Sequence, residues 1–370
     1  MFRTANMSII FRAWAIKSDD PHWTYIMIKD LTTSERNIFT KLHDNKSQQV
    51  FIARQQYAKS KKTGLFWELF EKSPNYQELV NRLSNNKYFM YGGGQACSRI
   101  LDVLKRENCV QNCTAILDKN SSKKEIEQIP VVNPTQLNST QLNSTVIAVV
   151  SLSKYNTAFG EVIEYLKKLG FAYTNIVIGY DLYANTVEQY FDEQIIIPKL
   201  TPKEIFADIG CCDFSTSLRL LEICGDAEKI YAFEPSALFQ EKCRNAIKNS
   251  GYDKCVFSTD ALWNINTQLA FGPDMFTDFK VLKVNASKFD DIVGSNVTFI
   301  KMDIEGAELN ALKGCSNSIV KYKPKLAISI YHKEYDYIEI PEFILSLNPN
   351  YKLYIRHYTA VEIDSVLYAV

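Results

Sequence analysis

The stretch Phe299-Ile300-Lys301-Met302-Asp303-Ile304-Glu305-Gly306-Ala307-Glu308 reads as a buried strand that ends in acidic residues and turns at a glycine into a helix. If the strand persists that far, Asp303 and Glu305 point the same way, because side chains alternate along a strand. The next apolar segment ends in Ile328-Ser329-Ile330-Tyr331-His332, and histidine is the commonest general base near neutral pH. Neighbouring strand ends can bring these side chains together, so we expect Asp303, Glu305 and His332 to meet at one sheet edge.

Two earlier strands also end in acidic residues. One runs into Asp208-Ile209-Gly210-Cys211-Cys212-Asp213, where the glycine permits a sharp turn beside a ligand. The other ends in Ala232-Phe233-Glu234-Pro235, which places Glu234 26 residues after Asp208. Doubly wound folds place an acid at about this spacing to hold two ribose hydroxyls. Together the two strand ends predict a site for a ligand that contains ribose.

Strands and helices alternate regularly from about residue 196 to the C-terminus. The expected strands are Ile205 to Ile209, Lys229 to Phe233, Cys255 to Phe257, Val297 to Met302, Leu326 to Tyr331, Tyr351 to Ile355, and Val366 to Val370. This alternation predicts an α/β fold with a doubly wound sheet that binds its ligands outside the carboxyl ends of the strands.

A smaller Rossmann-like α/β unit is expected over residues 87–195, after a helical N-terminal region at residues 1–86. In this unit Gly92-Gly93-Gly94-Gln95-Ala96-Cys97 follows a strand, and Asp118 ends the next strand. The pattern nearly matches the dinucleotide fingerprint G-x-G-x-x-G, with Cys97 in place of the third glycine. Gly92, Gly94 and Asp118 are therefore candidates for a second nucleotide or nucleotide-sugar site. The alternative is that the glycines only make a tight turn.

The composition narrows the class of protein. The 370 residues include 42 Lys and Arg against 42 Asp and Glu, and zero net charge disfavours nucleic acid and anionic membranes as partners. No stretch reaches the roughly 18 apolar residues that a membrane span needs. The nine cysteines are an odd number, and many fall inside apolar segments, which predicts a protein of the reducing cytoplasm. The chain has no Cys-x-x-Cys pair and four histidines, which leaves little material for a structural zinc site.

The ordered motifs from about Ile205 to Val370 resemble those of the FkbM family of S-adenosylmethionine-dependent methyltransferases. Besides the four stretches already quoted, the resemblance rests on Arg356-His357-Tyr358 and Val366-Leu367-Tyr368-Ala369. It implies a seven-strand methyltransferase sheet with an antiparallel last strand, and O-methyl transfer to a hydroxyl of a sugar, glycan or related small polar acceptor. The preceding unit is similar to Rossmann-like modules of sugar-modifying enzymes, which also stand ahead of some FkbM domains.

The resemblance also implies which residues bind the cofactor. Asp208 and Gly210 would lie under its methionine end, Glu234 on its ribose, and Asp260 and Ala261 on the adenine side. Asp213 and Asp303 complete the expected cofactor-binding set. One position departs from the family pattern, because Phe214 stands where the family has glycine. Phenylalanine does not adopt a positive φ cheaply, and its ring could crowd the methionine end, which leaves weak or altered cofactor binding open.

Methyl transfer from a sulfonium to a hydroxyl needs a base that takes the hydroxyl proton. His332 is the first candidate, with Asp303 or Glu305 as its orienting partner or as an alternative base. All three could instead serve structure or bind substrate. We expect no metal, although a divalent cation held by Asp303, Glu305 and His332 is an alternative. Arg356 and His357 could bind an anionic or sugar substrate, or form an ordinary surface ion pair.

Three functions remain after these observations. The leading one is a cytoplasmic methyltransferase acting on a small molecule or glycan, with S-adenosylmethionine as cofactor and homodimer formation left open. The second is a nicotinamide-dependent sugar-modifying enzyme that uses Gly92 to Asp118, although no Tyr-x-x-x-Lys pair, which short-chain enzymes use downstream, follows these residues. The third is a binding protein with a methyltransferase fold and no catalysis, for which Phe214 is the main argument.

Overall fold

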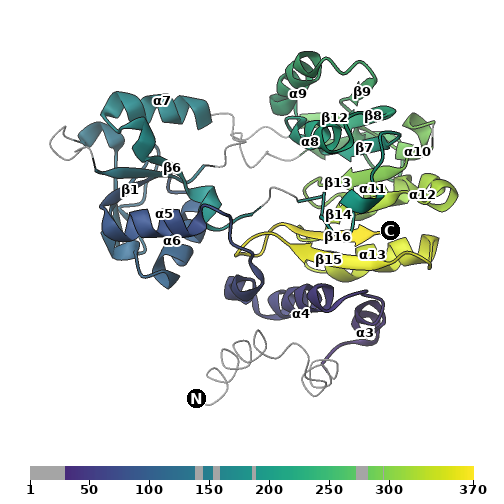
Figure 1. Ribbon diagram of the computed structural model, residues 1–370, viewed down its shortest axis with the longest axis horizontal. Helices are drawn as coiled ribbons and strands as arrows, with labels where there is room; N and C mark the ends of the chain where they lie inside the picture. The colour runs from purple at the N-terminus through teal and green to yellow at the C-terminus, as the bar shows by residue number, and fades with distance from the viewer. Residues whose placement is uncertain (1–29, 138–144, 153–158, 186–188, 272–281, 295) are drawn as a thin grey trace. The chain divides into compact units, whose positions relative to one another are not determined.

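Two sheets built mainly from parallel strands, one in each of two units, organise the chain (Figure 1). The structure is a computed structural model that describes residues 30–137, 145–152, 159–185, 189–271, 282–294 and 296–370. The first unit contains the described residues up to 69, those from 189 to 358, and 362–370. The second contains the described residues of 70–185, and 359–361.

These units differ from the expected divisions after residues 86 and 195. The helices at 33–60 pack into the same core as the last strands of the chain, so they belong to the first unit. The helix at 76–85 falls within the second unit. The first part of the expected N-terminal helical region, residues 1–29, lies outside the described residues.

The larger sheet belongs to the first unit and has the strand order β15-β16-β14-β13-β7-β8-β9. Its strands are β7 (Ile205–Ile209), β8 (Lys229–Phe233), β9 (Cys255–Ser258), β13 (Phe299–Met302), β14 (Lys325–Ser329), β15 (Leu353–His357) and β16 (Ser365–Ala369). β16 runs antiparallel to both of its neighbours, whereas the other neighbouring strands are parallel. The predicted fold class, a seven-strand α/β sheet with an antiparallel last strand, is confirmed.

The chain order of the strands reverses between β7 and β13. From β7 the chain proceeds to β8 and β9 on one side, and it later returns to β13 and β14 on the other. In doubly wound sheets such a switch point opens a crevice at the carboxyl ends of the strands, where ligands bind. The motifs from Asp208 and Asp303 lie at the ends of these two adjacent strands.

Strand residues alternate between two cores, one on each face of the sheet. In β7, Ile205, Ala207 and Ile209 lie in one core, whereas Phe206 lies in the other. Helices α3 (Thr33–Phe39), α4 (Asn45–Ser60), α10 (Phe289–Ile292), α11 (Glu308–Gly314), α12 (Ser316–Tyr322) and α13 (Asp336–Leu347) contribute to the first core. Helices α8 (Ser215–Cys224) and α9 (Ala237–Ser250) contribute to the second. This period of two, with apolar residues on both faces, is typical of a sheet covered by helices on both sides.

A short sheet, β10 (Ala261–Leu262), β12 (Leu282–Ser287) and β11 (Thr267–Phe271), follows β9 in the first unit. The second unit contains a sheet of order β3-β4-β2-β1-β5-β6. Its elements are α5 (Tyr76–Asn85), β1 (Tyr88–Tyr91), α6 (Gln95–Arg106), β2 (Cys113–Leu117), β3 (Glu125–Ile126), β4 (Ile129–Val132), β5 (Ile147–Val150), α7 (Phe159–Leu169) and β6 (Ile176–Ile178). β4, β2, β1, β5 and β6 pair in parallel, and β3 pairs with β4 as an antiparallel hairpin.

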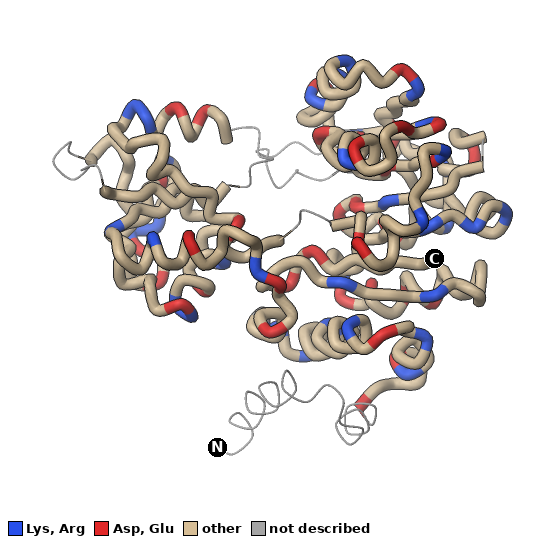
Figure 2. The backbone as a smooth tube through the Cα atoms, viewed as in Figure 1, with Lys and Arg blue, Asp and Glu red and all other residues tan. Residues whose placement is uncertain are grey.

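Lys and Arg alternate with Asp and Glu along the described backbone of both units, as expected for a chain with zero net charge (Figure 2). Within the described ranges, the helices are too short or too polar for any of them to cross a membrane.

Candidate active site

The turn after β7 lies directly against the end of β13. Gly210 adopts a φ of 78°, and a Cβ atom at this position would come within 1.9 Å of the backbone oxygen of Asp303. Only glycine fits this position, because any side chain would clash with backbone that has no room to move. Gly210, the glycine predicted to make the sharp turn, therefore also lets the turn after β7 lie close to Asp303 at the end of β13.

Phe214, at the start of α8, adopts a φ of 70°. Its ring is fully buried and belongs to the core that also holds Phe191 and Leu220. The ring therefore packs in the protein interior, which argues against the possibility that it crowds the methionine end of a cofactor. Burial of the aromatic ring offsets the backbone strain that a left-handed conformation imposes on a residue other than glycine.

Asp208 is completely buried and forms an ion pair with Lys301, whose Nζ lies 3.1 Å from its Oδ1. Its Oδ2 accepts a hydrogen bond of 2.7 Å from the hydroxyl of Ser217. The ammonium group of Lys301 also donates to the backbone oxygen of Gly210 at 2.6 Å. Burial works against the charge on Lys301, but the negative charge of Asp208 outweighs it and raises the pKa of the amine. Lys301 thus binds the backbone of the glycine turn, and Asp208 neutralises Lys301 in the protein interior. Neither charge faces a ligand, because both side chains are buried.

Glu234 follows β8, and its side chain is anchored at the same edge. Its Oε2 accepts the backbone N–H of Cys212 at 2.9 Å, and its Oε1 accepts the backbone N–H of Ser236 at 2.8 Å. These bonds fix the carboxylate beside the glycine turn. Asp213 lies on the same turn and accepts the backbone N–H of Ser215 at 3.1 Å.

Asp260 lies just beyond β9, immediately before Ala261 at the start of β10. Its Oδ2 accepts a hydrogen bond of 2.7 Å from the hydroxyl of Ser287. The expected adenine-side residues therefore follow a strand that ends at the same sheet edge as β8, because the two strands pair in parallel.

Asp303, Glu305 and His332 meet, as their positions in the sequence predicted. The Nε2 atom of His332 lies 3.5 Å from Asp303 Oδ1 and 3.5 Å from Glu305 Oε2. The route differs from the expected one, because β13 ends at Met302 and does not carry the alternation to Glu305. Glu305 instead turns back at a φ of 55°, and its side chain is largely exposed.

A third carboxylate, Glu308, completes the surroundings of His332. This residue is completely buried at the start of α11, and its Oε1 lies 2.9 Å from His332 Nδ1. Burial of the imidazole opposes its positive charge, but the neighbouring carboxylates of Glu308 and Asp303 outweigh this effect and raise the pKa of His332 to about 9. In this arrangement His332 carries a positive charge at neutral pH, so only a small fraction is ready to accept a proton.

Two tyrosines hold Asp303. The hydroxyl of Tyr190 donates to Asp303 Oδ2 at 2.6 Å, and that of Tyr331 donates to Asp303 Oδ1 at 3.3 Å. Burial alone would raise the pKa of Asp303, but the charges of His332 and Lys301 and the hydrogen bond from Tyr190 lower it. Glu308 and Tyr331 lie in stretches that the sequence analysis quoted without assigning them a role. Tyr190 lies far from any of the motifs, and no local pattern points to it.

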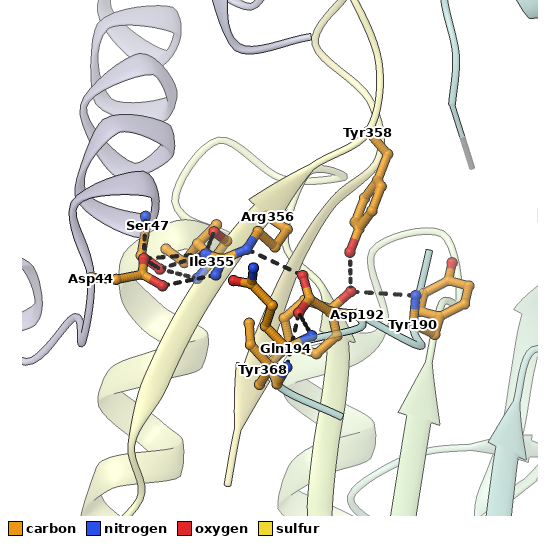
Figure 3. A network of polar contacts seen from close by, with 10 residues as sticks. Asp44, Ser47, Tyr190, Asp192, Gln194, Ile355, Arg356, Tyr358 and Tyr368 are labelled. Atoms are coloured by element: carbon orange, nitrogen blue, oxygen red, sulfur yellow. Dashed lines mark hydrogen bonds and ion pairs between the residues drawn. The ribbon is translucent and has the colours of Figure 1, made fainter. Parts of the chain in front are cut away.

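Arg356 and His357, the candidate substrate residues, are both buried. Figure 3 shows Arg356 between Asp44 and Asp192. The guanidinium of Arg356 contacts Asp44 at 2.8 Å and Asp192 at 3.2 Å. His357 Nδ1 lies 2.7 Å from the hydroxyl of Ser365, and its ring stacks on a phenylalanine of the same unit. In these positions Arg356 joins the start of α4 to β15, which is a structural task.

In the second unit, the side chain of Asp118, which follows β2, binds the glycine-rich turn after β1. Gly92 adopts a φ of 95°, and Gly94 precedes α6. Asp118 Oδ2 accepts the backbone N–H of Gly93 at 2.8 Å, while its Oδ1 accepts the N–H groups of Asn120 and Ser121. Asp118, a candidate for the second nucleotide site, thus binds three backbone donors of its own unit.

Comparisons with known proteins agree with this geometry. Residues 204–353 match the family model described as Methyltransferase FkbM domain. Among solved structures, the chain is similar to methyltransferase FkbM from Methylobacillus flagellatus KT, with 19% identity and a TM-score of 0.50 over 86% of this chain and 97% of that one. The comparison with curated proteins gave no significant match.

Two further solved structures are less similar. An rRNA methylase from Streptococcus thermophilus has 16% identity and a TM-score of 0.33, over 47% of this chain and 89% of that one. Aeropyrum pernix fibrillarin, in complex with natively bound S-adenosyl-L-methionine, has 10% identity and a TM-score of 0.30, over 46% of this chain and 69% of that one. The family match and the sheet topology support methyltransferase activity. Residues 204–353 therefore form a methyltransferase FkbM domain, the family that the motifs of the sequence predicted.

Proposed function

We propose that the protein is an S-adenosylmethionine-dependent O-methyltransferase that acts on a hydroxyl of a sugar, a glycan or a related small polar acceptor. The observation that carries the proposal is the order of chemical groups along one sheet edge. Gly210, Glu234, Asp260, Asp303 and His332 follow five strands of one sheet, at the crevice where the strand order reverses.

The residues present fit the proposed cofactor. Backbone N–H groups of Cys212 and Ser236 fix the orientation of the Glu234 carboxylate, which is the acceptor that we assign to the ribose hydroxyls. Gly210 and Asp213 lie on the same turn, which is bound by Lys301, the ion-pair partner of Asp208. Asp260 and Ala261 lie beside the next strand end, on the adenine side. The acidic character of this edge also suits a cationic sulfonium.

S-adenosylmethionine, when bound, supplies an electrophilic methyl group, and the protein aligns the acceptor and receives its proton. His332 is our first choice for the proton acceptor. Because its pKa is raised to about 9, the rate would increase with pH up to that value. Asp303 orients the imidazole from 3.5 Å, and Glu305 is the exposed carboxylate that can pass the proton to solvent.

Cofactor binding can be tested by calorimetric titration and thermal shift with S-adenosylmethionine, S-adenosylhomocysteine and NAD. Both S-adenosyl ligands should raise the melting temperature, because only a ligand of the folded state does so. The Glu234→Ala variant should lose this shift. Glu222→Ala provides a matched control, because Glu222 is an exposed glutamate on α8. If neither S-adenosyl ligand binds the native chain, the proposed function is wrong.

The acceptor class comes from the family resemblance and needs its own test. Transfer of a labelled methyl group to panels of free glycans, sugars and nucleotide-sugars would identify it, and the absence of any O-methylated product would contradict this part of the proposal. One alternative loses support from the geometry, because the ring of Phe214, the argument for a non-catalytic protein, is buried in the core. Against the nicotinamide-dependent enzyme stands the sequence, in which no Tyr-x-x-x-Lys pair follows Gly92. The nine cysteines are free thiols, which agrees with a cytoplasmic location.

A further inference from the structure

We propose that Asp303, Glu308 and His332 bind a divalent cation of the magnesium or manganese class at the site of methyl transfer. This inference rests on the proposed function only for the role of the cation, since the ligand set can be tested without any methyl acceptor. It changes the set considered from the sequence, because Glu308 takes the place of Glu305. With the cation bound, His332 is a ligand, and Glu305 replaces it as the proton acceptor of the proposed function.

The three side chains converge from separate elements. Asp303 follows β13, Glu308 begins α11, and His332 follows β14. One ligand atom from each residue lies within 4.8 Å of those from the other two. Glu308 is completely buried, and the side chain of His332 is about nine-tenths buried, with a 10% exposed fraction. The cluster is therefore part of the protein interior rather than a group of acids on the surface.

Polar atoms in this cluster lack partners, which is a second observation that points to a ligand. The Oε2 atom of Glu308 is buried and has no hydrogen-bond partner. Neither ring nitrogen of His332 makes a hydrogen bond, because its 2.9 Å contact with Glu308 is short but not directed as a hydrogen bond requires. Buried polar groups are nearly always paired in folded proteins. A cation between these side chains would complete the coordination of all of them.

The balance of charge at the cluster favours a dication. Asp303, Glu305 and Glu308 surround His332, so three carboxylates face one imidazole. The nearby Lys301 already neutralises Asp208. A single proton on His332 offsets one negative charge, whereas a divalent ion offsets two and lets the imidazole bind as a neutral ligand.

The ligand types indicate which cations fit. Carboxylate oxygens are the preferred ligands of Mg²⁺ and Mn²⁺, and one imidazole nitrogen extends the set toward Mn²⁺. The cluster contains no thiolate of the kind that selects soft metals, since its described members are two carboxylates and one histidine. We therefore use Mn²⁺ as the probe.

The cation would activate the acceptor hydroxyl. A bound cation lowers the pKa of an oxygen that coordinates it, so the O–H bond breaks more readily and its proton passes to the carboxylate of Glu305. The oxygen then bonds to the methyl carbon as the carbon–sulfur bond breaks, and the bonding electron pair returns to sulfur. Glu305 suits this task because its side chain is exposed and can release the proton to water.

Mn²⁺ binding to the full chain can be measured by electron paramagnetic resonance, since bound Mn²⁺ loses the sharp signal of the free ion. The protein is first treated with EDTA and then titrated with Mn²⁺ to about 1 mM, the weak end of the range for carboxylate sites. We expect one bound ion per chain, with Mg²⁺ competing for it. Absence of binding over this range would overturn the proposal.

Two isosteric variants show whether Mn²⁺ binds to a defined set of ligands or is attracted only by the negative charge of the cluster. Glu308→Gln should weaken Mn²⁺ binding about tenfold or more, because it removes a ligand charge and keeps the shape of the side chain. Glu305→Gln is the matched control, because it removes a carboxylate at the same cluster from outside the ligand set, and Mn²⁺ affinity should change by less than about threefold. Equal losses in both variants would contradict the ligand set.

Folding and cofactor binding are measured in parallel. If Glu308→Gln fails to fold, Asp303→Asn provides the second ligand variant with the same expected loss. Calorimetric titration with S-adenosylmethionine in EDTA reports on the proposed function independently. A chain that binds the cofactor but no Mn²⁺ would overturn this inference alone, whereas a chain that binds Mn²⁺ and no cofactor would overturn the proposed function.

Discussion

The ammonium group of Lys301 lies 3.1 Å from the carboxylate of Asp208, and both side chains are almost completely buried. Lys301 comes from β13 and Asp208 from β7, so the ion pair crosses between the two strands at the switch point of the sheet. The same ammonium group donates to the backbone of Gly210. The pair therefore connects the strand that delivers Asp303 to the turn that borders the proposed cofactor site.

Replacing Lys301 with Met should destabilise the protein by about 3–5 kcal/mol, because it leaves Asp208 charged and uncompensated in the interior. The double variant Asp208→Asn with Lys301→Met should recover about 2 kcal/mol or more, since it removes the orphaned charge and keeps the bond to Ser217. Urea unfolding of the two single variants and the double variant measures this coupling. Additive losses would show that the pair contributes no interaction of its own.

The fold was largely predictable from the sequence, because each strand of the seven-strand sheet is a short apolar run bounded by a turn or a helix start. The expected and observed strands differ by at most two residues at either end, as for β13, expected from Val297 and observed from Phe299, and β7 and β8 have the expected bounds. The short sheet of β10, β11 and β12 was not expected. The association of α4 with β15 was also missed, because contacts between Ser47 and Ile355 join segments about 300 residues apart.

Only those residues of the candidate site that directly follow a strand could be predicted from the sequence. Glu234, Asp303 and His332 could be placed at one edge because parallel strands end together. Glu308 joins the cluster through the first turn of a helix, and Tyr190 joins it from a segment that precedes the whole domain. Neither position follows from a local pattern. For Arg356 the sequence left substrate binding and a surface ion pair open, because it does not reveal Asp44 and Asp192, which neutralise the buried guanidinium.

Gly210→Ala should destabilise the protein much more than Gly225→Ala. Both glycines have a positive φ, which costs a residue with a Cβ about 1–2 kcal/mol. At Gly225 a Cβ has nothing within 4 Å, whereas at Gly210 it would lie 1.9 Å from backbone oxygen. We expect about 3 kcal/mol or more of additional loss at Gly210, measured by urea unfolding, together with loss of S-adenosylmethionine binding. Similar losses in both variants would mean that the turn can move away from β13.

At Phe214, the residue that precedes α8, glycine should be tolerated better than alanine. Removing the buried ring costs about 3–5 kcal/mol in either variant. Phe214→Gly also relieves the positive φ, so it should be more stable than Phe214→Ala by about 1–2 kcal/mol. Paired denaturation curves test this order. Greater stability of the alanine variant would show that the backbone at this position is not left-handed.

The raised pKa of His332 predicts a loss of stability at alkaline pH. The pKa is 6.5 in the unfolded chain and about 9 in the folded one, so the folded state retains a proton that the unfolded state releases. In EDTA, the stabilisation should be complete below pH 6.5, where it amounts to about 3 kcal/mol, and it should be lost as the pH rises to about 9. His332→Gln should be less stable than the native protein at pH 6 and converge with it above pH 9. His43→Gln, which replaces a histidine that packs on Tyr354 elsewhere in the unit, is the matched control for the loss of an imidazole. Denaturation at a series of pH values measures this difference, and a native profile that stays flat between pH 6.5 and 9 would show that the carboxylates of Asp303 and Glu308 do not hold a proton on His332.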